Sequence, residues 1–253
     1  MVKLGLGEAR QFLLRSVYRR MRSIELRPPV VSFCFDDFPH TAYSAGGAIL
    51  KSLGVRATYY ASFGLVNTTN ELGPQLTQDD LESLLSDGHD LGSHTFSHWS
   101  ACRVSLEDFE RNVLQGRDTA RRMTGNDELD NFAYPYGHVT LASKKRLTSE
   151  LSSCRGIYPG INGPEVDLNL LRANSLYGDI DQLVRAESLL SENARRSGWL
   201  IFYTHDVQRT PSPFGCTPSL LDNAVALSLE KGFQILTVGE VVRRLTSHPL
   251  PSA

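Results

Sequence analysis

Short apolar runs alternate with helical patterns along most of this chain, and this alternation restricts the fold more than any other feature. Strands are predicted at 30–35, 57–61, 90–94, 131–134, 170–173, 200–204 and 233–236. Helices are predicted at 42–53, 78–86, 106–123, 141–150, 180–197, 219–231 and 240–245. Because a helix separates each strand from the next, we expect an α/β protein with a parallel sheet. No linker or internal repeat divides the 253 residues, and α/β barrels commonly use such a length as one domain.

The composition excludes several classes of protein. Hydrophobic residues make up 41% of the chain and charged residues 21%, as in ordinary globular proteins. The net charge of −2 gives no electrostatic reason to expect a nucleic-acid partner. The four cysteines form no C-x-x-C pair, and there is neither a membrane-spanning run nor the pattern of a secretion signal. We therefore expect a cytoplasmic protein with a small or neutral ligand, and the oligomeric state stays open.

The first 23 residues are strongly basic. Six basic residues face the single acid Glu8, which leaves a local charge of +5. Apolar residues recur there at helical spacing, so we expect a basic amphipathic helix that ends before Pro28. Such a helix either packs on its own domain or attaches the protein to the inner face of an anionic membrane. The predicted organisation is an extension at 1–28, a catalytic domain at 29–246 and a tail at 247–253.

Two clusters of polar residues follow predicted strands. Asp36 and Asp37 come directly after the run 30–35, where two adjacent carboxylates need a compensating cation unless they form a turn or a helix cap. His94 and His98 follow the next-but-one strand and share one face if a helical turn begins there. Two imidazoles and one carboxylate can hold a divalent metal and leave positions open for water and substrate. His89, at the entrance of that strand, is interpreted as a structural histidine.

Two further segments end at the same side of the predicted sheet. The strand at 131–134 closes in Pro135-Tyr136-Gly137, which a structural turn also explains. The apolar strand at 200–204 delivers His205 to its carboxyl end, where a general acid or a structural cap can lie. Each segment alone has an ordinary structural explanation. Because the carboxyl ends of parallel strands meet at one edge, all four segments can form one site.

At this point the sequence resembles the polysaccharide deacetylases, the NodB-type members of carbohydrate esterase family 4. Four segments carry the resemblance, in the family's order: Phe35-Asp36-Asp37, Gly88-His-Asp-Leu-Gly-Ser-His94 with His98, Phe132-Ala-Tyr-Pro-Tyr-Gly137 and Leu200-Ile-Phe-Tyr-Thr-His205. It covers roughly Pro29 to Leu245. The fold it implies is a distorted, TIM-like (β/α) barrel of about seven parallel strands, the NodB homology domain.

The resemblance also implies a role for each matching residue. One divalent metal ion would be held by three residues, Asp37, His94 and His98, with zinc as the first expectation and other divalent ions accepted by the same ligands. Asp36 would be the general base and His205 the general acid. The backbone N–H of Tyr136 would help the metal to stabilise the oxyanion of the intermediate.

The sequence departs from the family pattern at three places. Phe38 follows the two aspartates where the family commonly has glycine, and Ala133 stands where an arginine often orients the base. Arg172, near the end of a later predicted strand, is one candidate to orient Asp36 instead, and a plain surface arginine is the other interpretation. No fourth motif is recognisable, so the partner of His205 stays unassigned.

These observations predict a metal-dependent hydrolase that removes N-acetyl groups from an amino sugar. The expected substrate is an N-acetylated sugar such as a chito-oligosaccharide, a lipid-linked glycan or a precursor of a surface polysaccharide. Tyr134, Tyr136 and Phe38 suit stacking on a sugar ring, although core packing explains each equally well. Two alternatives stay open: an allantoinase-like amide hydrolase of a small metabolite, and a carbohydrate-binding relative that has lost catalysis.

Overall fold

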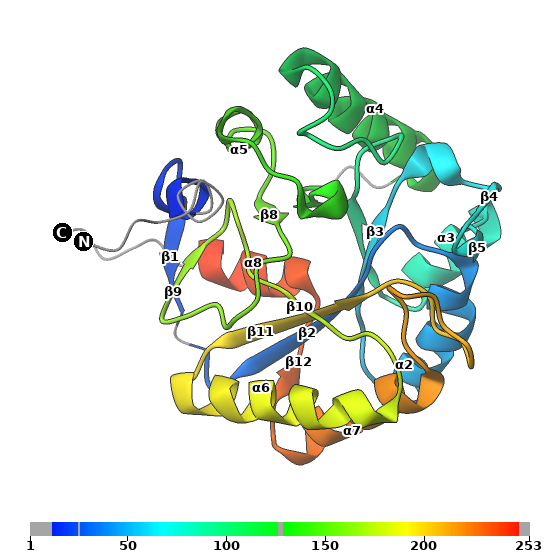
Figure 1. The fold of residues 1–253 in the computed structure, drawn as a ribbon, viewed down its shortest axis with the longest axis vertical. Coiled ribbons are helices and arrows are strands. Elements are labelled where there is room, and N and C mark those ends of the chain that lie inside the picture. Colours follow the sequence, from blue (N-terminus) through cyan, green and yellow to red (C-terminus); the bar gives the residue numbers. More distant parts are fainter. Residues whose placement is uncertain (1–11, 25, 126–128, 248–253) are drawn as a thin grey trace.

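A curled parallel sheet organises the computed structural model, which describes residues 12–24, 26–125 and 129–247. Its strands, in spatial order, are β10 (Asn174–Ser175), β11 (Trp199–Thr204), β2 (Val30–Phe35), β3 (Thr58–Ala61), β6 (Asp90–Ser93), β7 (Asn131–Ala133) and β8 (Ser153–Arg155). Every neighbouring pair is parallel. The sheet forms a half-barrel (Figure 1), so the predicted distorted (β/α) barrel is confirmed.

The central strand β2 is paired along both edges. One edge pairs with β11 over all six residues. On the other edge, β12 (Gln234–Ile235) pairs with Val30 and Val31, and β3 pairs with Cys34 and Phe35. All six side chains of β2 are consequently buried, which explains why this strand reads as a continuous apolar run.

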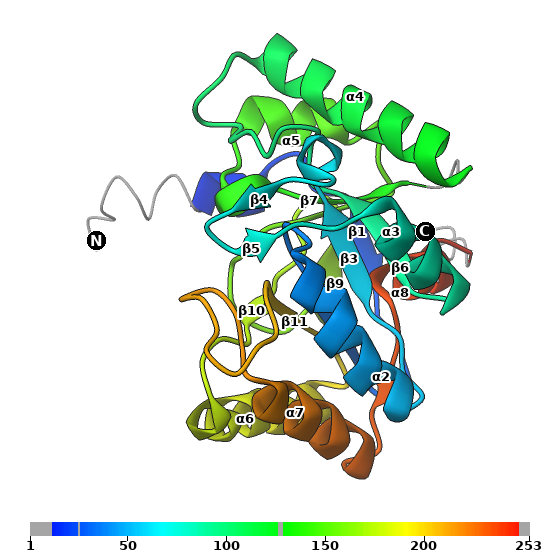
Figure 2. The same ribbon diagram turned by 90° about the vertical axis from the view of Figure 1, so that its right-hand side faces the viewer.

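Helices cover the outside of the half-barrel in two groups (Figures 1 and 2). A π-helix, η1 (Ala42–Gly47), leads into α2 (Ala48–Ser52), which lies with α6 (Leu183–Arg196) and α7 (Pro218–Glu230) along β2 and β11. The group at the other end contains α4 (Leu106–Thr124) and α5 (Leu141–Leu147). The helices α3 (Gln78–Ser86) and α8 (Val238–Ser247) complete the outer layer.

Short elements link these layers. They are the 3-10 turns η2 (Phe63–Leu65), η3 (Pro135–Gly137) and η4 (Ile180–Gln182), the hairpin of β4 (Thr69–Asn70) with β5 (Gly73–Pro74), and the pair β1 (Met21–Ser23) with β9 (Glu165–Asp167). No helix in the described part of the chain is long and apolar enough to cross a bilayer.

Two predictions about the sheet are wrong. A strand was not expected at Ser153–Arg155, because this segment contains no apolar run, yet it forms β8 and is buried on both faces. Conversely, the strand predicted at 170–173 is reduced to one bridge between Leu171 and Arg155. The side chain of Asn162 accepts the Arg172 N–H at 2.9 Å, which takes that amide out of any strand ladder.

The N-terminal segment also differs from its prediction. Residues 12–16 are helical, but Met21–Ser23 form strand β1, antiparallel to β9, so the helix does not continue to Pro28. The described part of this segment is fixed to the domain by hydrogen bonds. The buried Lys144 Nζ donates to the Leu14 carbonyl at 2.8 Å, and Arg20 donates to the carbonyls of Thr148 and Ser152. Residues 1–11 and 248–253 lie outside the described part, and the predicted domain boundaries stay predictions.

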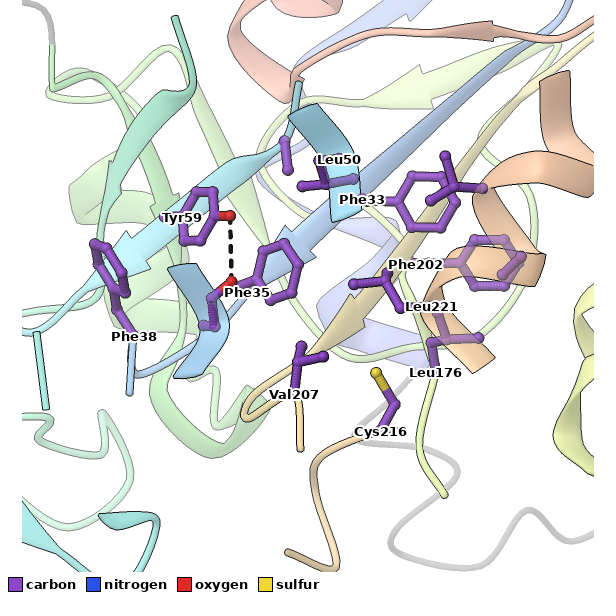
Figure 3. Close-up of a cluster of buried hydrophobic side chains, with 14 of the residues drawn as sticks. Phe33, Phe35, Phe38, Leu50, Tyr59, Leu176, Phe202, Val207, Cys216 and Leu221 are labelled. Carbon is purple, nitrogen blue, oxygen red and sulfur yellow. Dashed lines mark hydrogen bonds between the residues drawn. The ribbon is translucent and has the colours of Figure 1, made fainter. Parts of the chain in front are cut away.

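The main hydrophobic core lies between β2, β11 and the helices α2, α6 and α7 (Figure 3). Phe33 stacks on Phe202 with ring centroids 5.6 Å apart, and Phe35 stacks on Tyr59 at 4.6 Å. Successive side chains of a strand point to opposite faces, so Cys34 lies on the concave face together with Tyr60. The same alternation directs the next even-numbered residue, Asp36, into the half-barrel.

His89 is the structural histidine that the sequence predicted. It is buried, its Nδ1 accepts the Ala57 N–H at 3.1 Å, and its ring packs edge-on against Tyr59. An acceptor nitrogen must be unprotonated, and burial lowers the pKa of His89 to about 4.

Stability is therefore expected to fall as the pH drops from 6.5 towards 4. In that range the unfolded chain binds a proton at His89 and the folded chain does not, so the free energy of unfolding decreases by up to about 3 kcal/mol. Chemical denaturation at both ends of the range measures this loss. His89→Gln should show a smaller loss, whereas the control His40→Gln, at a half-buried histidine, should resemble the wild type. Equal losses in His89→Gln and the wild type would contradict the assignment.

Candidate active site

Asp36 and Asp37 turn the chain sharply at the carboxyl end of β2. The Asp36 N–H still donates to Thr204 of β11 at 2.9 Å, and Asp37 then takes a φ of +62°. Phe38 follows with a φ of +64°, a conformation that favours glycine. Its ring is fully buried, 4.9 Å from the ring of Tyr59, which offsets the unfavourable backbone. Phe38 therefore belongs to the core and not to a sugar-binding surface.

The three predicted metal ligands meet at one point. Asp37 Oδ1 lies 3.2 Å from His94 Nε2 and 2.9 Å from His98 Nε2, and the three residues form a group that could hold a metal ion. Burial alone would raise the pKa of Asp37, but the two adjacent imidazoles outweigh it and hold that pKa well below the ordinary value. Burial lowers the pKa of His94, which keeps this ring neutral. Both effects favour the protonation states that a metal requires.

A bend, and not the predicted helical turn, brings the two histidines together. Thr95 and His98 both have positive φ, at +66° and +55°. Asn112 on α4 holds this bend, since its side-chain oxygen accepts the N–H groups of Phe96 and Ser97 at 3.1 and 2.9 Å. His94 Nδ1 lies 2.8 Å from the Ala133 carbonyl oxygen, so Nδ1 carries the proton and Nε2 offers its lone pair to the site.

Asp36 forms a buried ion pair with Arg155, at the end of β8. The carboxylate is 4% exposed and the guanidinium residue 1%, and Arg155 Nη2 donates to Asp36 Oδ1. The guanidinium also lies between the rings of Tyr60 and Tyr203, 4.8 and 5.1 Å from their centroids. Burial alone would lower the pKa of Arg155, but the Asp36 charge reverses this and raises it, so the arginine stays charged.

The prediction that Arg172 orients Asp36 is corrected by this pair. Arg172 Nη1 donates to the Pro159 carbonyl at 2.9 Å, on the outside of the half-barrel. Its neighbour Leu171 packs into the interior with Tyr60 and Tyr203. Because adjacent residues of an extended segment point to opposite sides, Arg172 cannot reach Asp36.

His205 follows the end of β11 and lies near the second carboxylate oxygen of Asp37. Its Nε2 is 3.9 Å from Asp37 Oδ2, and its Nδ1 is 3.1 Å from the Phe214 carbonyl oxygen. The Phe214 carbonyl oxygen accepts a hydrogen bond from the Nδ1–H group, which leaves Nε2 facing the site. The partner of His205 that the sequence could not assign is therefore a main-chain group.

These residues line one cavity of about 260 Å³. Its walls are formed by Asp36, Asp37, Glu71, Leu72, His94, His98, Tyr134, Tyr136, Gly137, Ile157, Tyr177, Tyr203, His205 and Phe214. Tyr136 and Phe214 are about half exposed at the mouth, whereas Tyr134 is buried. The ring of Tyr136 lies on His98, with centroids 4.5 Å apart. The part that its backbone N–H plays stays a prediction.

The sequence analysis missed several of these residues. For Tyr203 a signal existed, because it lies two residues before His205 on the same face of β11. For Arg155, Ile157 and Phe214 no local signal existed, since each comes from a segment without strand or motif character. Their places depend on how the chain closes around the half-barrel.

A family model gives the decisive comparison: the model described as polysaccharide deacetylase matches residues 23–151. The chain belongs to the polysaccharide deacetylase family. The match includes Asp36, Asp37, His94 and His98, and it ends before the segment that contributes Arg155. The resemblance found in the sequence is confirmed.

Relatives and solved structures extend the similarity to most of the chain. The chitin deacetylase of Colletotrichum lindemuthianum is 24% identical over 218 residues, which cover 85% of this chain and 79% of that protein. Its solved structure has a TM-score of 0.59 at 23% identity, covering 87% of this chain and 88% of that one.

Two other solved structures share the fold. The Xyl-CE4 domain of a multidomain xylanase from the hindgut metagenome of Trinervitermes trinervoides has a TM-score of 0.61 at 17% identity, covering 88% of this chain and 93% of that one. A family 4 acetyl xylan esterase from Clostridium thermocellum, in complex with a cobalt ion, has a TM-score of 0.59 at 20% identity, covering 87% and 93%. This deacetylase-family chain thus keeps the fold at low sequence identity.

Proposed function

We propose that this member of the polysaccharide deacetylase family is a metal-dependent hydrolase that removes N-acetyl groups from an amino sugar within a glycan. One observation carries the proposal. The side chains of Asp37, His94 and His98 converge at the floor of the cavity, with the Asp36–Arg155 pair and His205 near them.

The donor atoms fit a divalent cation. Among the described residues, Asp37 Oδ1 is a buried oxygen that accepts no hydrogen bond, and the Nε2 atoms of His94 and His98 face it. Two nitrogens and one carboxylate oxygen suit zinc, and other divalent ions accept the same set. Bound there, such an ion would supply Lewis-acid chemistry, which acidifies water and polarises a carbonyl group.

The residues of the chain itself account for the proton transfers. Asp36, which Arg155 keeps in place, takes a proton from the attacking water as the water oxygen bonds to the acetamide carbon. The C–N bond then breaks, and His205, which for this step carries a proton on Nε2 as well as on Nδ1, gives the Nε2 proton to the departing nitrogen. Acetate and the free amine are released, and the proton that Asp36 took from water replaces the one that His205 gave up. The Tyr136 N–H would stabilise the negative oxygen of the intermediate.

The walls of the cavity support a sugar as the substrate. Tyr136, Ile157 and Phe214 expose 53, 40 and 52% of their surface around the mouth. The two aromatic rings suit the apolar faces of sugar rings, and Ile157 adds apolar surface beside them. The names of the relatives include both a chitin deacetylase and an acetyl xylan esterase. Acetate release is measured from N-acetylated chito-oligosaccharides and from O-acetylated xylan. The ratio of the two rates distinguishes specificity for amides from specificity for esters.

Metal content is the first test of the proposal. The purified protein is expected to bind about one zinc or similar ion per chain after metal is added, and His94→Ala should lose it, because two of three ligands hold an ion weakly. Elemental analysis measures both. His40→Ala, which changes a histidine paired with Asp80 outside the cavity, is the matched control. Wild-type protein that stays metal-free after loading would overturn the proposed chemistry.

We also propose that the basic segment places the protein at the inner face of a membrane. Phe12 and Leu13 are 59 and 47% exposed, and Arg15 and Arg19 on the same segment are exposed, which supports contact with anionic lipids. Sedimentation with vesicles that contain anionic lipid is expected to retain the wild type and to release the double variant Phe12→Ser/Leu13→Ser. Wild type that stays in the supernatant would exclude this attachment.

A further inference from the structure

The orientation of His205 depends on one main-chain carbonyl. Phe214 O lies 3.1 Å from His205 Nδ1 and also accepts the His205 N–H at 3.2 Å. No carboxylate among the described residues lies within hydrogen-bond distance of His205 Nδ1. Phe214 is part of the exposed loop between β11 and α7, so the position of the ring depends on what holds this loop.

A buried carboxylate holds the loop. Asp206 is fully buried, and its Oδ2 accepts the N–H of Ser212 and the side-chain amide of Gln208, both at 2.8 Å. Its main-chain oxygen accepts the Cys216 N–H at 2.9 Å. Gly215 lies so close that a Cβ at this position would collide with the Asp206 carboxylate. Three hydrogen bonds and the close approach of Gly215 thus fix both ends of the loop to Asp206.

Ser212 connects this carboxylate to Phe214. The hydroxyl of Ser212 donates to Asp206 Oδ1 and accepts the Phe214 N–H at 3.1 Å. A continuous series of hydrogen bonds therefore runs from Asp206 through Ser212 and the Phe214 peptide units to His205. Hydrogen bonds to an ionised carboxylate are stronger than those between neutral groups, so this series is anchored at its buried end.

We propose that Asp206 and Ser212 are positioning residues for His205, acting through the main chain of Phe214, although neither lines the cavity. The inference deepens the proposed function and rests on it for the role of His205. It also explains how this chain orients the imidazole without a recognisable fourth motif. Because the ring of Phe214 is a wall of the cavity, the same loop sets both the substrate surface and the general acid.

Two substitutions separate positioning from general stability. Ser212→Ala removes the hydroxyl that links Asp206 to Phe214, and Asp206→Asn removes the charged anchor. Each is expected to lower kcat about 10-fold or more, a part of what general acid–base catalysis contributes, with metal content unchanged. Ser212→Thr keeps a hydroxyl and should restore most of kcat. Asp179→Asn is the control, since it removes the charge of the carboxylate that accepts the Thr217 hydroxyl at the end of the same loop, without touching the series.

The ring of His205 gives a readout that needs no substrate. In protein labelled with 15N at histidine, the wild type is expected to show one His205 tautomer with the proton on Nδ1, assigned by comparison with His205→Gln. Ser212→Ala and Asp206→Asn should replace it by a mixture, and Asp179→Asn should not. Unchanged His205 signals in both variants would overturn the proposal, even if kcat fell. Failure of the wild type to release acetate would instead count against the proposed function and leave the NMR result standing.

Discussion

Asp36→Asn is expected to lower kcat by about 10²- to 10⁴-fold, the range that general acid–base catalysis contributes. Asparagine has nearly the same shape as aspartate but cannot take a proton from water. Asp37, His94 and His98 are untouched, so metal binding should persist. Acetate release by metal-loaded, folded protein measures the effect on turnover, and elemental analysis confirms the metal.

The control for this variant is Asp206→Asn, which removes another buried carboxylate near the site. We expect its loss of kcat to be smaller than that of Asp36→Asn, because Asp206 acts through other residues and touches no reacting atom. If Asp36→Asn kept wild-type turnover on a verified substrate, Asp36 would not be the base.

Arg155→Met is expected to destabilise the fold by about 3–5 kcal/mol, because it leaves the buried Asp36 carboxylate without its counter-ion. Methionine roughly fills the space between Tyr60 and Tyr203, so packing is the smaller part of the change. Chemical denaturation measures the free energy of unfolding. The loss should be accompanied by a large fall in kcat, since Arg155 no longer holds the Asp36 carboxylate in place.

Arg172→Met and a double variant complete this test. Arg172 lies on the outside of the half-barrel, so its replacement should change stability by about 1 kcal/mol or less and leave kcat unchanged. Asp36→Asn combined with Arg155→Met removes both charges and should recover part of the stability lost in Arg155→Met alone. A larger effect of Arg172→Met than of Arg155→Met would reverse the assignment of the two arginines.

The family pattern is thus retained in some positions and rebuilt in others. Ala133 occupies the place of the usual arginine, and the adjacent strand β8 supplies Arg155 to the same carboxylate. Phe38, where the family commonly has glycine, adopts a left-handed conformation and uses its ring in the core. The partner of Asp36 is thus an arginine that only the folded chain brings near.

The sequence by itself determined the fold class and five residues of the candidate site. Buried parallel strands require apolar runs, and their carboxyl ends meet at one edge, which is enough to place Asp36, Asp37, His94, His98 and His205 together. The period of two along β2 also puts Asp36 on the concave face. These inferences need only local patterns and one topological rule.

The tertiary structure alone decided which groups surround those residues. Leu171 faces inward and Arg172 outward because the Arg172 N–H donates a hydrogen bond to the side chain of Asn162, ten residues earlier in the chain. Arg155 reaches Asp36 across 119 positions of sequence, and Phe214 reaches His205 because a buried Asp206 folds the intervening loop back. Such partners depend on the closure of loops and on non-local packing, which no local periodicity encodes.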